Sequence, residues 1–208
     1  MEQKAIEIAN AHRIMAVSTV RPDGWPQNTI VGYANEGLLV YFLISRSSQK
    51  FANIQADDRI SVAIGSEPDD FSQLKALYAG AHASEVTDPK QREHAWNLLI
   101  ARHPNLADYE VPDWSAAAMM RAPCMFVSIV DFTKGLGHAD NVTVSGPGLA
   151  LMEPARVEDW GYGPALGTSP DSGRPAESPS SPHRRRETPA VAKERIDEKL
   201  QSDRAGTA

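Results

Sequence analysis

Short apolar runs separated by tight turns fill most of the first 146 residues and limit the possible folds more than any other feature. Residues 14–20 and 27–34 lie on either side of Pro22-Asp23-Gly24, where proline presets a turn and Asp-Gly tolerates positive φ. After a second turn at residues 35–37, residues 38–45 are almost wholly apolar. The pattern predicts three strands joined as an antiparallel meander.

Further along the chain the same signals predict four more strands and three connecting helices. The strands are expected at residues 59–66, 74–87, 122–132 and 138–145, with a bulge at Gly80, and the helices at residues 2–12, 49–54 and 88–103. Residues 104–121 read as irregular. An open sheet of six or seven antiparallel strands would expose its edges, so the expected fold is mainly β, a closed antiparallel split barrel with short connecting helices.

The composition changes after Gly146. Residues 147–208 are rich in Pro, Ser, Gly, Arg and Glu and hold too little apolar side chain to offset the entropy of ordering. We therefore expect a barrel domain over residues 1–146 and a disordered tail over 147–208, with at most a marginal helix near residues 190–201.

Charge and composition exclude several classes of function. The net charge of −6 argues against nucleic acid as a partner. No apolar run approaches the ~18 residues that span a membrane, and the charged start of the chain is unlike a secretory signal, so a cytoplasmic protein is expected. The single cysteine, Cys124, lies in an apolar run and is expected to be buried and inert.

Residues 45–50 carry the strongest chemical signal, because they leave a strand and open a helix. The first N–H groups of a helix have no internal partner, and the helix dipole places partial positive charge there. Ser47, Ser48 and Lys50 at that point suit a phosphate. On these residues alone, the simpler interpretation is a serine that merely caps the helix beside solvated Arg46 and Lys50.

The order of these elements resembles the pyridoxamine 5′-phosphate oxidase-like split-barrel superfamily over roughly residues 5–145. The resemblance rests on the Asp-Gly hairpin, the apolar third strand, the Ser-x-Lys helix start and the strand that begins Asp57-Asp58-Arg59. The run Gly80-Ala81-His82 before a helix that starts Asp88-Pro89-Lys90 also fits.

The resemblance implies a homodimer with FMN at the subunit interface and a small-molecule substrate. By this resemblance Ser48 and Lys50, with Gln49 between them, would bind the cofactor phosphate, and Ser45 would lie near the phosphate or the ribityl chain. The second strand would run along the isoalloxazine ring through Asn28, Thr29, Ile30 and Val31. The implied activity is that of an FMN-dependent oxidoreductase, in which the cofactor supplies the chemistry.

The sequence also departs from the family pattern. Flavin-binding members carry arginines where this chain has Asn28 and Gln49, and we expect Arg46 to replace one of them in part. Leu166 stands where the vitamin-forming oxidase has an arginine, so pyridoxamine phosphate is not assigned as the substrate. The alternatives are a deazaflavin (F420)-dependent reductase and a non-enzymatic module that binds flavin or haem.

No other cluster of residues indicates catalysis, and the catalytic residues stay unassigned. His82 and His138 lack neighbouring ligands at short spacing, so we interpret them as structural histidines and expect no metal site. Trp114 and the pair Met119-Met120 fall in the irregular stretch, and we expect them to pack at a dimer interface rather than over the cofactor.

Overall fold

A computed structural model describes residues 1–65, 67–145 and 151–154. The strands are β1 (Ile14–Val20), β2 (Pro26–Glu36), β3 (Leu39–Ser45), β4 (Arg59–Gly65), β5 (Lys75–His82), β6 (Ser84–Glu85), β7 (Ala117–Asp131), β8 (Ala139–Ser145) and β9 (Leu151–Pro154). The helices are α1 (Glu2–Ala11), α2 (Gln49–Ala56) and α3 (Pro89–Arg102), with 3₁₀ turns at Phe71–Gln73, Pro104–Asp108 and Phe132–Lys134. No helix in these ranges is long and apolar enough to cross a membrane.

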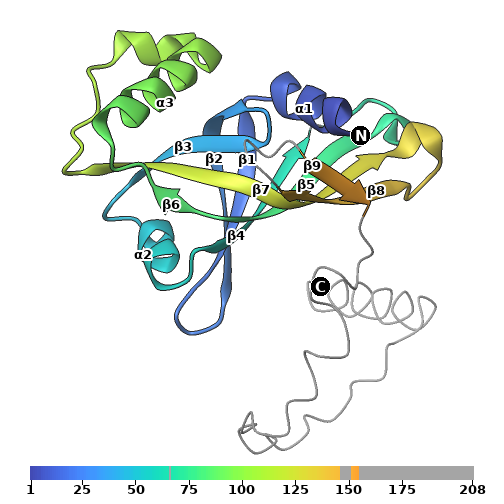
Figure 1. The fold of residues 1–208 in the computed structure, drawn as a ribbon, viewed down its shortest axis with the longest axis horizontal. Coiled ribbons are helices and arrows are strands. Elements are labelled where there is room, and N and C mark those ends of the chain that lie inside the picture. Colours follow the sequence, from blue (N-terminus) through green and yellow to red (C-terminus); the bar gives the residue numbers. More distant parts are fainter. Residues whose placement is uncertain (66, 146–150, 155–208) are drawn as a thin grey trace, which may run out of the picture. The chain divides into compact units, whose positions relative to one another are not determined.

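The strands close into the predicted antiparallel barrel (Figure 1). Hydrogen-bonded neighbours run β3-β2-β1-β4-β5-β7, and β7 returns to pair with β3 through seven positions, from Leu39↔Pro123 to Ser45↔Ala117. The pairing of β2 with β3 is much shorter and covers only residues 33–36 against 39–42. The barrel is therefore split beside the first half of β2.

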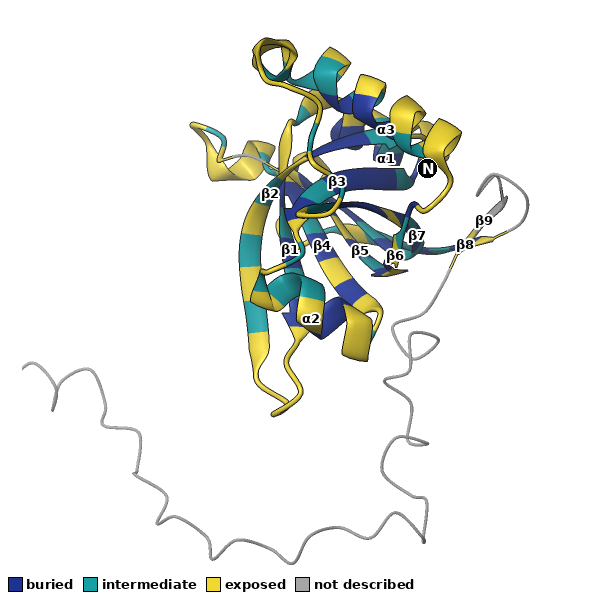
Figure 2. Cartoon of the chain, turned by 90° about the vertical axis from the view of Figure 1, so that its left-hand side faces the viewer, coloured by how far each residue is buried: buried dark blue, intermediate teal, exposed yellow. Residues whose placement is uncertain are grey.

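Alternation along the strands explains the core. Five residues that are cross-strand partners on successive strands face inward, and all of them are buried: Val17, Val62, Ala79, Val127 and Val142. Figure 2 shows the same alternation of buried and exposed positions along β4. Helix α1 packs on this core through Ala5 and Ile8, and the hydroxyl of Tyr33 donates to the Ala9 carbonyl at 2.6 Å.

Strand β7 begins at Ala117 rather than at residue 122, so the prediction of an irregular stretch up to residue 121 was wrong there. Met119 and Met120 are fully buried in this strand. The expectation that they pack at a dimer interface was therefore also wrong. The signal was missed because alanine and methionine, which have low β propensity, replace the β-branched residues that mark a strand.

The predicted strand over residues 74–87 is divided in two. The register shifts between Gly80 and Ala81, which confirms the predicted bulge, and β5 ends at His82. Ala83 N then donates to the Asp58 carbonyl at 2.8 Å, and β6 pairs with a different part of β7, at Arg121 and Met120. The bulge and bend carry the chain round a corner of the barrel.

Strand β9 pairs with β8 from Val142↔Pro154 to Ser145↔Leu151, beyond the predicted domain end at Gly146. Four residues of the predicted tail, 151–154, thus form a strand, while the rest of that tail and the helix predicted near residues 190–201 lie outside the described residues.

Asp131 joins α1 to the end of β7, and its loss is expected to destabilise the fold. Its side chain is 5% exposed, and the carboxylate pairs with Lys4 Nζ and accepts from the Thr133 hydroxyl at 2.6 Å. These hydrogen bonds hold the pKa of Asp131 well below its usual range. A depressed folded pKa stabilises the protein above the unfolded value of ~3.9, and this contribution is lost as the pH falls through the folded value.

We therefore expect Asp131→Asn to lower the free energy of unfolding by about 1–3 kcal/mol at pH 7. The difference from the wild type should shrink as the pH falls below about 4. Urea unfolding at several pH values measures it, with the exposed Asp69 replaced by Asn as the control. A deficit that is the same at acid and neutral pH would contradict the role of the carboxylate charge.

Candidate functional site

The first half of β2 presents an open backbone edge. Residues 26–32 pair with β1 on one side, and no strand of the described chain pairs with them on the other. Tyr33 N donates to Arg13 O at 3.1 Å, and Arg21 N donates to Trp25 O at 3.0 Å. Since antiparallel bonding alternates, the N–H and C=O groups of Asn28 and Ile30 point away from β1. Among the described residues, the predicted ring-binding strand thus has backbone donors and acceptors without partners.

The four predicted residues of this strand are divided between its two faces. Asn28 and Ile30 are exposed on the outside of the barrel, Ile30 to 64%. Val31 packs against the main core, and Thr29 Oγ1 is buried with no hydrogen-bond partner among the described residues. An unmet buried hydroxyl costs roughly 1–3 kcal/mol. The strand can therefore offer backbone groups at its edge, but of these four residues only Asn28 and Ile30 reach the outside with their side chains.

Ile30 is the first of a row of apolar residues on the outer surface of the barrel. Cross-strand partners continue the row from Ile30 to Ala16, Ala63 and Tyr78 on β1, β4 and β5. These residues, with Ile14, line a groove of about 330 Å³, which we call the outer groove. Small alanines in the middle, with exposed Ile30 and Tyr78 at the ends, make a platform suited to a flat apolar ring.

The start of α2 has the predicted features of an anion site. Ser48 caps the helix by accepting from Phe51 N at 3.2 Å and donates its hydroxyl to the Ser45 carbonyl at 2.7 Å. The hydroxyls of Ser45 and Ser47 lie 2.8 Å apart. Within the described chain, the backbone N–H groups of Gln49 and Lys50 have no acceptor. The capping interpretation is therefore correct for Ser48, and it leaves these two donors free.

Lys50 is the cation of this site. Its side chain is half-buried, and among the described residues it makes no hydrogen bond or ion pair. Burial lowers the pKa of Lys50, because desolvation disfavours the charged ammonium. A phosphate bound here would supply an opposite charge and would favour the charged ammonium form of Lys50.

Arg46 does not supply a second cation, contrary to the sequence prediction. Its guanidinium pairs with both carboxylate oxygens of Glu85, with Nη1 3.2 Å from Oε2. Nε donates to the Trp114 carbonyl at 3.1 Å, and the guanidinium lies over the Phe51 ring. The charge of Arg46 is therefore already compensated, and the side chain joins β3, β6 and α2.

Gln49, which occupies the position of a family arginine, is exposed as a residue, but its side-chain amide reaches back to helix α2. Its Nε2 donates to Asn53 Oδ1 at 2.9 Å. Asn53 is fully buried and also bonds to Thr19 and Gln27, so these three residues belong to the surroundings of the site although the sequence analysis missed them. The one available signal was a polar residue between the core-facing Phe51 and Ile54.

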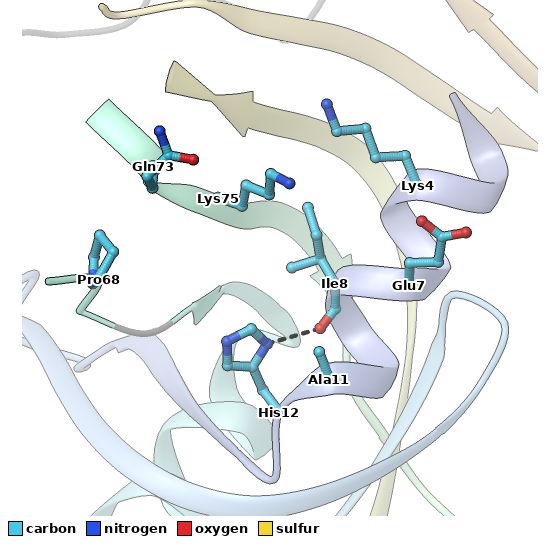
Figure 3. A pocket seen from close by; sticks show the side chains of 8 residues that line it. All are labelled: Lys4, Glu7, Ile8, Ala11, His12, Pro68, Gln73 and Lys75. Carbon is cyan, nitrogen blue, oxygen red and sulfur yellow. Dashed lines mark hydrogen bonds between the residues drawn. The ribbon is translucent and has the colours of Figure 1, made fainter. Parts of the chain in front are cut away.

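A second and larger cavity, of about 470 Å³, lies between α1 and the start of β5 (Figure 3). Its polar lining consists of Lys4, Glu7, His12, Gln73 and Lys75. Asp131 compensates the charge of Lys4, and the Glu7 carboxylate adds a negative charge to the lining that also holds Lys75. His12 Nδ1 lies 2.8 Å from the Ile8 carbonyl at the end of α1. The balanced charge makes this cavity a weaker anion site than the start of α2.

The remaining candidate residues make contacts within the described chain that are typical of structural side chains. Cys124 is fully buried, and burial raises the pKa of its thiol to about 12, which makes it unreactive. His82 Nδ1 lies 2.8 Å from Asp58 Oδ1, and His138 Nε2 lies 3.2 Å from Asp140 Oδ1. Trp114, which the sequence analysis expected at a dimer interface, packs instead against the cluster around Trp96 of the same chain, and Arg92 stacks on its ring.

Solved structures share this fold. A haem-binding protein from Mycobacterium smegmatis matches with a TM-score of 0.59 and 20% identity, over 68% of this chain and 57% of that protein. A FAD-binding protein from Mesorhizobium loti matches with a TM-score of 0.50 and 21% identity, over 62% and 93%. For HutZ, the haem storage protein of Vibrio cholerae, the values are 0.50, 16%, 59% and 89%. The chain thus spans little more than half of the Mycobacterium smegmatis protein.

No curated protein matches the sequence. The family model described as pyridoxamine 5′-phosphate oxidase matches residues 1–130, which include the whole of α2, the open edge of β2 and most of β7. This match covers well over half of the chain and agrees with the split-barrel topology. The protein therefore belongs to the pyridoxamine 5′-phosphate oxidase family.

Proposed function

We propose that the protein binds FMN and acts as a flavin-dependent oxidoreductase on a small-molecule substrate. The observation that carries the proposal is Lys50, a half-buried cation without a partner in the described chain, on a capped helix start with two free N–H donors. The family membership and a similar fold in a FAD-binding protein support a flavin.

The residues present fit such a group. Ser48, Lys50 and the free N–H groups of α2 would hold the phosphate. The backbone edge at Asn28 and Ile30 would bind the polar edge of the ring, and the outer groove would receive its apolar face. A bound flavin would supply electron transfer, while the protein supplies binding, orientation and electrostatics.

The proposal includes a homodimer. Ile14, Ile30 and Tyr78 leave large apolar surfaces exposed, at 55%, 64% and 44%. Such a patch on the outer wall is typical of an interface. A second copy over the outer groove would bury it and enclose the cofactor. Sedimentation equilibrium tests this part, since a monomer at all concentrations would contradict it.

Two other ligands fit specific features. A deazaflavin with a phosphate group would use the same start of α2. Haem has no phosphate, but the apolar outer groove suits its ring, and two proteins of similar fold bind or store haem. A non-enzymatic haem or flavin carrier is therefore the second candidate.

The visible spectrum of the purified protein, before and after addition of FMN or haem, tests the proposal. We expect retained flavin bands near ~450 nm after gel filtration, which a nicotinamide donor bleaches. A strong band near ~400 nm with haem alone would favour the haem carrier. Flavin that binds but stays oxidised with every donor would contradict the oxidoreductase, and no retained chromophore would contradict both candidates.

A further inference from the structure

We infer that Asn53 is a positioning residue that holds the phosphate-binding start of α2 beside the open edge of β2. The inference rests on the proposed function and concerns a residue that does not itself face the phosphate. It follows from the hydrogen bonds of one buried amide, which join the two halves of the candidate site.

The Asn53 side chain is fully buried, and each of its polar groups is engaged. Nδ2 donates to Thr19 Oγ1 and to Gln27 Oε1, both at 2.9 Å. Oδ1 accepts from Gln49 Nε2 at 2.9 Å. One side chain therefore connects α2 to β1 and β2. A buried amide of this kind destabilises the fold unless its hydrogen-bond partners are in place.

Two of the three partners lie directly before residues that would bind the cofactor, and the third pairs with one of these two. Gln27 directly precedes Asn28, the first residue of the open edge with outward-pointing backbone groups. Gln49 directly precedes Lys50. Thr19 is the cross-strand partner of Gln27, which fixes the end of the β1–β2 pair. The Asn53 amide thus sets the position of Lys50 relative to Asn28.

Helix α2 depends on such contacts for its position. It has eight residues, and helices this short are unstable in water without tertiary packing. Phe51 and Ile54 attach it to the core by apolar contacts, which are not directional. The hydrogen bonds of Asn53 fix its rotation and its distance from β2. A small displacement of the helix would weaken the phosphate contacts, while the ring would keep its contacts with β2 and the outer groove.

Paired titrations with FMN and riboflavin, which lacks the phosphate, isolate this effect. Asn53→Ala and the isosteric Thr19→Val are each expected to weaken FMN binding about tenfold, with riboflavin binding changed less than about threefold. Gln55→Ala, on the exposed face of the same helix, is the matched control and should change neither affinity. Thermal unfolding of each variant verifies that the fold is retained.

The outcomes separate the positioning role from the proposed function. If Asn53→Ala and Thr19→Val keep the wild-type ratio of FMN affinity to riboflavin affinity, the positioning role is overturned and the proposed function is not affected. An equal loss of both ligands in Thr19→Val would indicate a general structural role and would also overturn it. If Asn53→Ala does not fold, the affinities of Thr19→Val test the positioning role on their own. A wild-type protein that binds FMN no better than riboflavin, or binds neither, would refute the phosphate site and with it both proposals.

Discussion

Replacement of Lys50 by alanine is expected to lower the affinity for FMN by about 10- to 100-fold. A hydrogen bond to a charged group contributes roughly 1.5–3 kcal/mol, and each 1.4 kcal/mol is a factor of ten in affinity. Lys50 is the one cation that the described chain places at the start of α2 without a partner, because Arg46 is paired with Glu85. No neighbouring charge is therefore available to replace it. Fluorescence titration of FMN measures the change.

Lys75→Ala is the matched control for this experiment. Lys75 is also a lysine without a partner in the described chain, but it lines the cavity beside α1. We expect its replacement to leave FMN affinity unchanged. Riboflavin binding should be insensitive to both substitutions. A Lys50→Ala protein that binds FMN as the wild type does would exclude Lys50 from the phosphate site.

Met120→Ala is expected to lower the free energy of unfolding by about 2–5 kcal/mol. Met120 is fully buried and lies opposite Phe42, also fully buried, in the pairing of β3 with β7 that closes the barrel. Truncation removes apolar contacts and leaves a cavity at a place where two strands fix the spacing. Chemical denaturation at pH 7 measures the loss.

Val111→Ala provides the comparison, because Val111 is 65% exposed in the loop before β7 and should change stability by less than about 0.5 kcal/mol. The oligomeric state of the folded Met120→Ala protein should match the wild type. Unchanged stability together with a changed oligomeric state would restore the sequence-based view that Met120 packs at a subunit interface.

The strands that the sequence predicted best are those with local signals. Pro22 and the Asp23-Gly24 pair mark the first hairpin, and the observed β1, β2 and β3 follow the apolar runs on either side of the turns. The first half of β7 was missed because its residues give no local strand signal. Met119 and Met120 become strand residues through pairing with β3, which lies far away in the sequence.

For the candidate site too, the sequence predicted the features that depend on neighbouring residues and missed those that depend on distant ones. The serine cap and the position of Lys50 at the helix start follow from adjacent residues. The ion pair of Arg46 with Glu85 and the bonds of Asn53 to Thr19 and Gln27 join different elements, so no pattern of spacing reveals them. The open edge of β2 also depends on where β3 stops pairing, which tertiary structure determines.

Backbone hydrogen–deuterium exchange with and without saturating FMN tests the central claim most directly, because it locates the ligand on the chain. We predict slower exchange at the amides of Asn28 and Ile30 on β2 and of Gln49 and Lys50 on α2, which have free N–H groups in the described structure. Protection confined to the cavity around Lys4 and Lys75, or none at all, would contradict the assignment of the flavin phosphate to the start of α2.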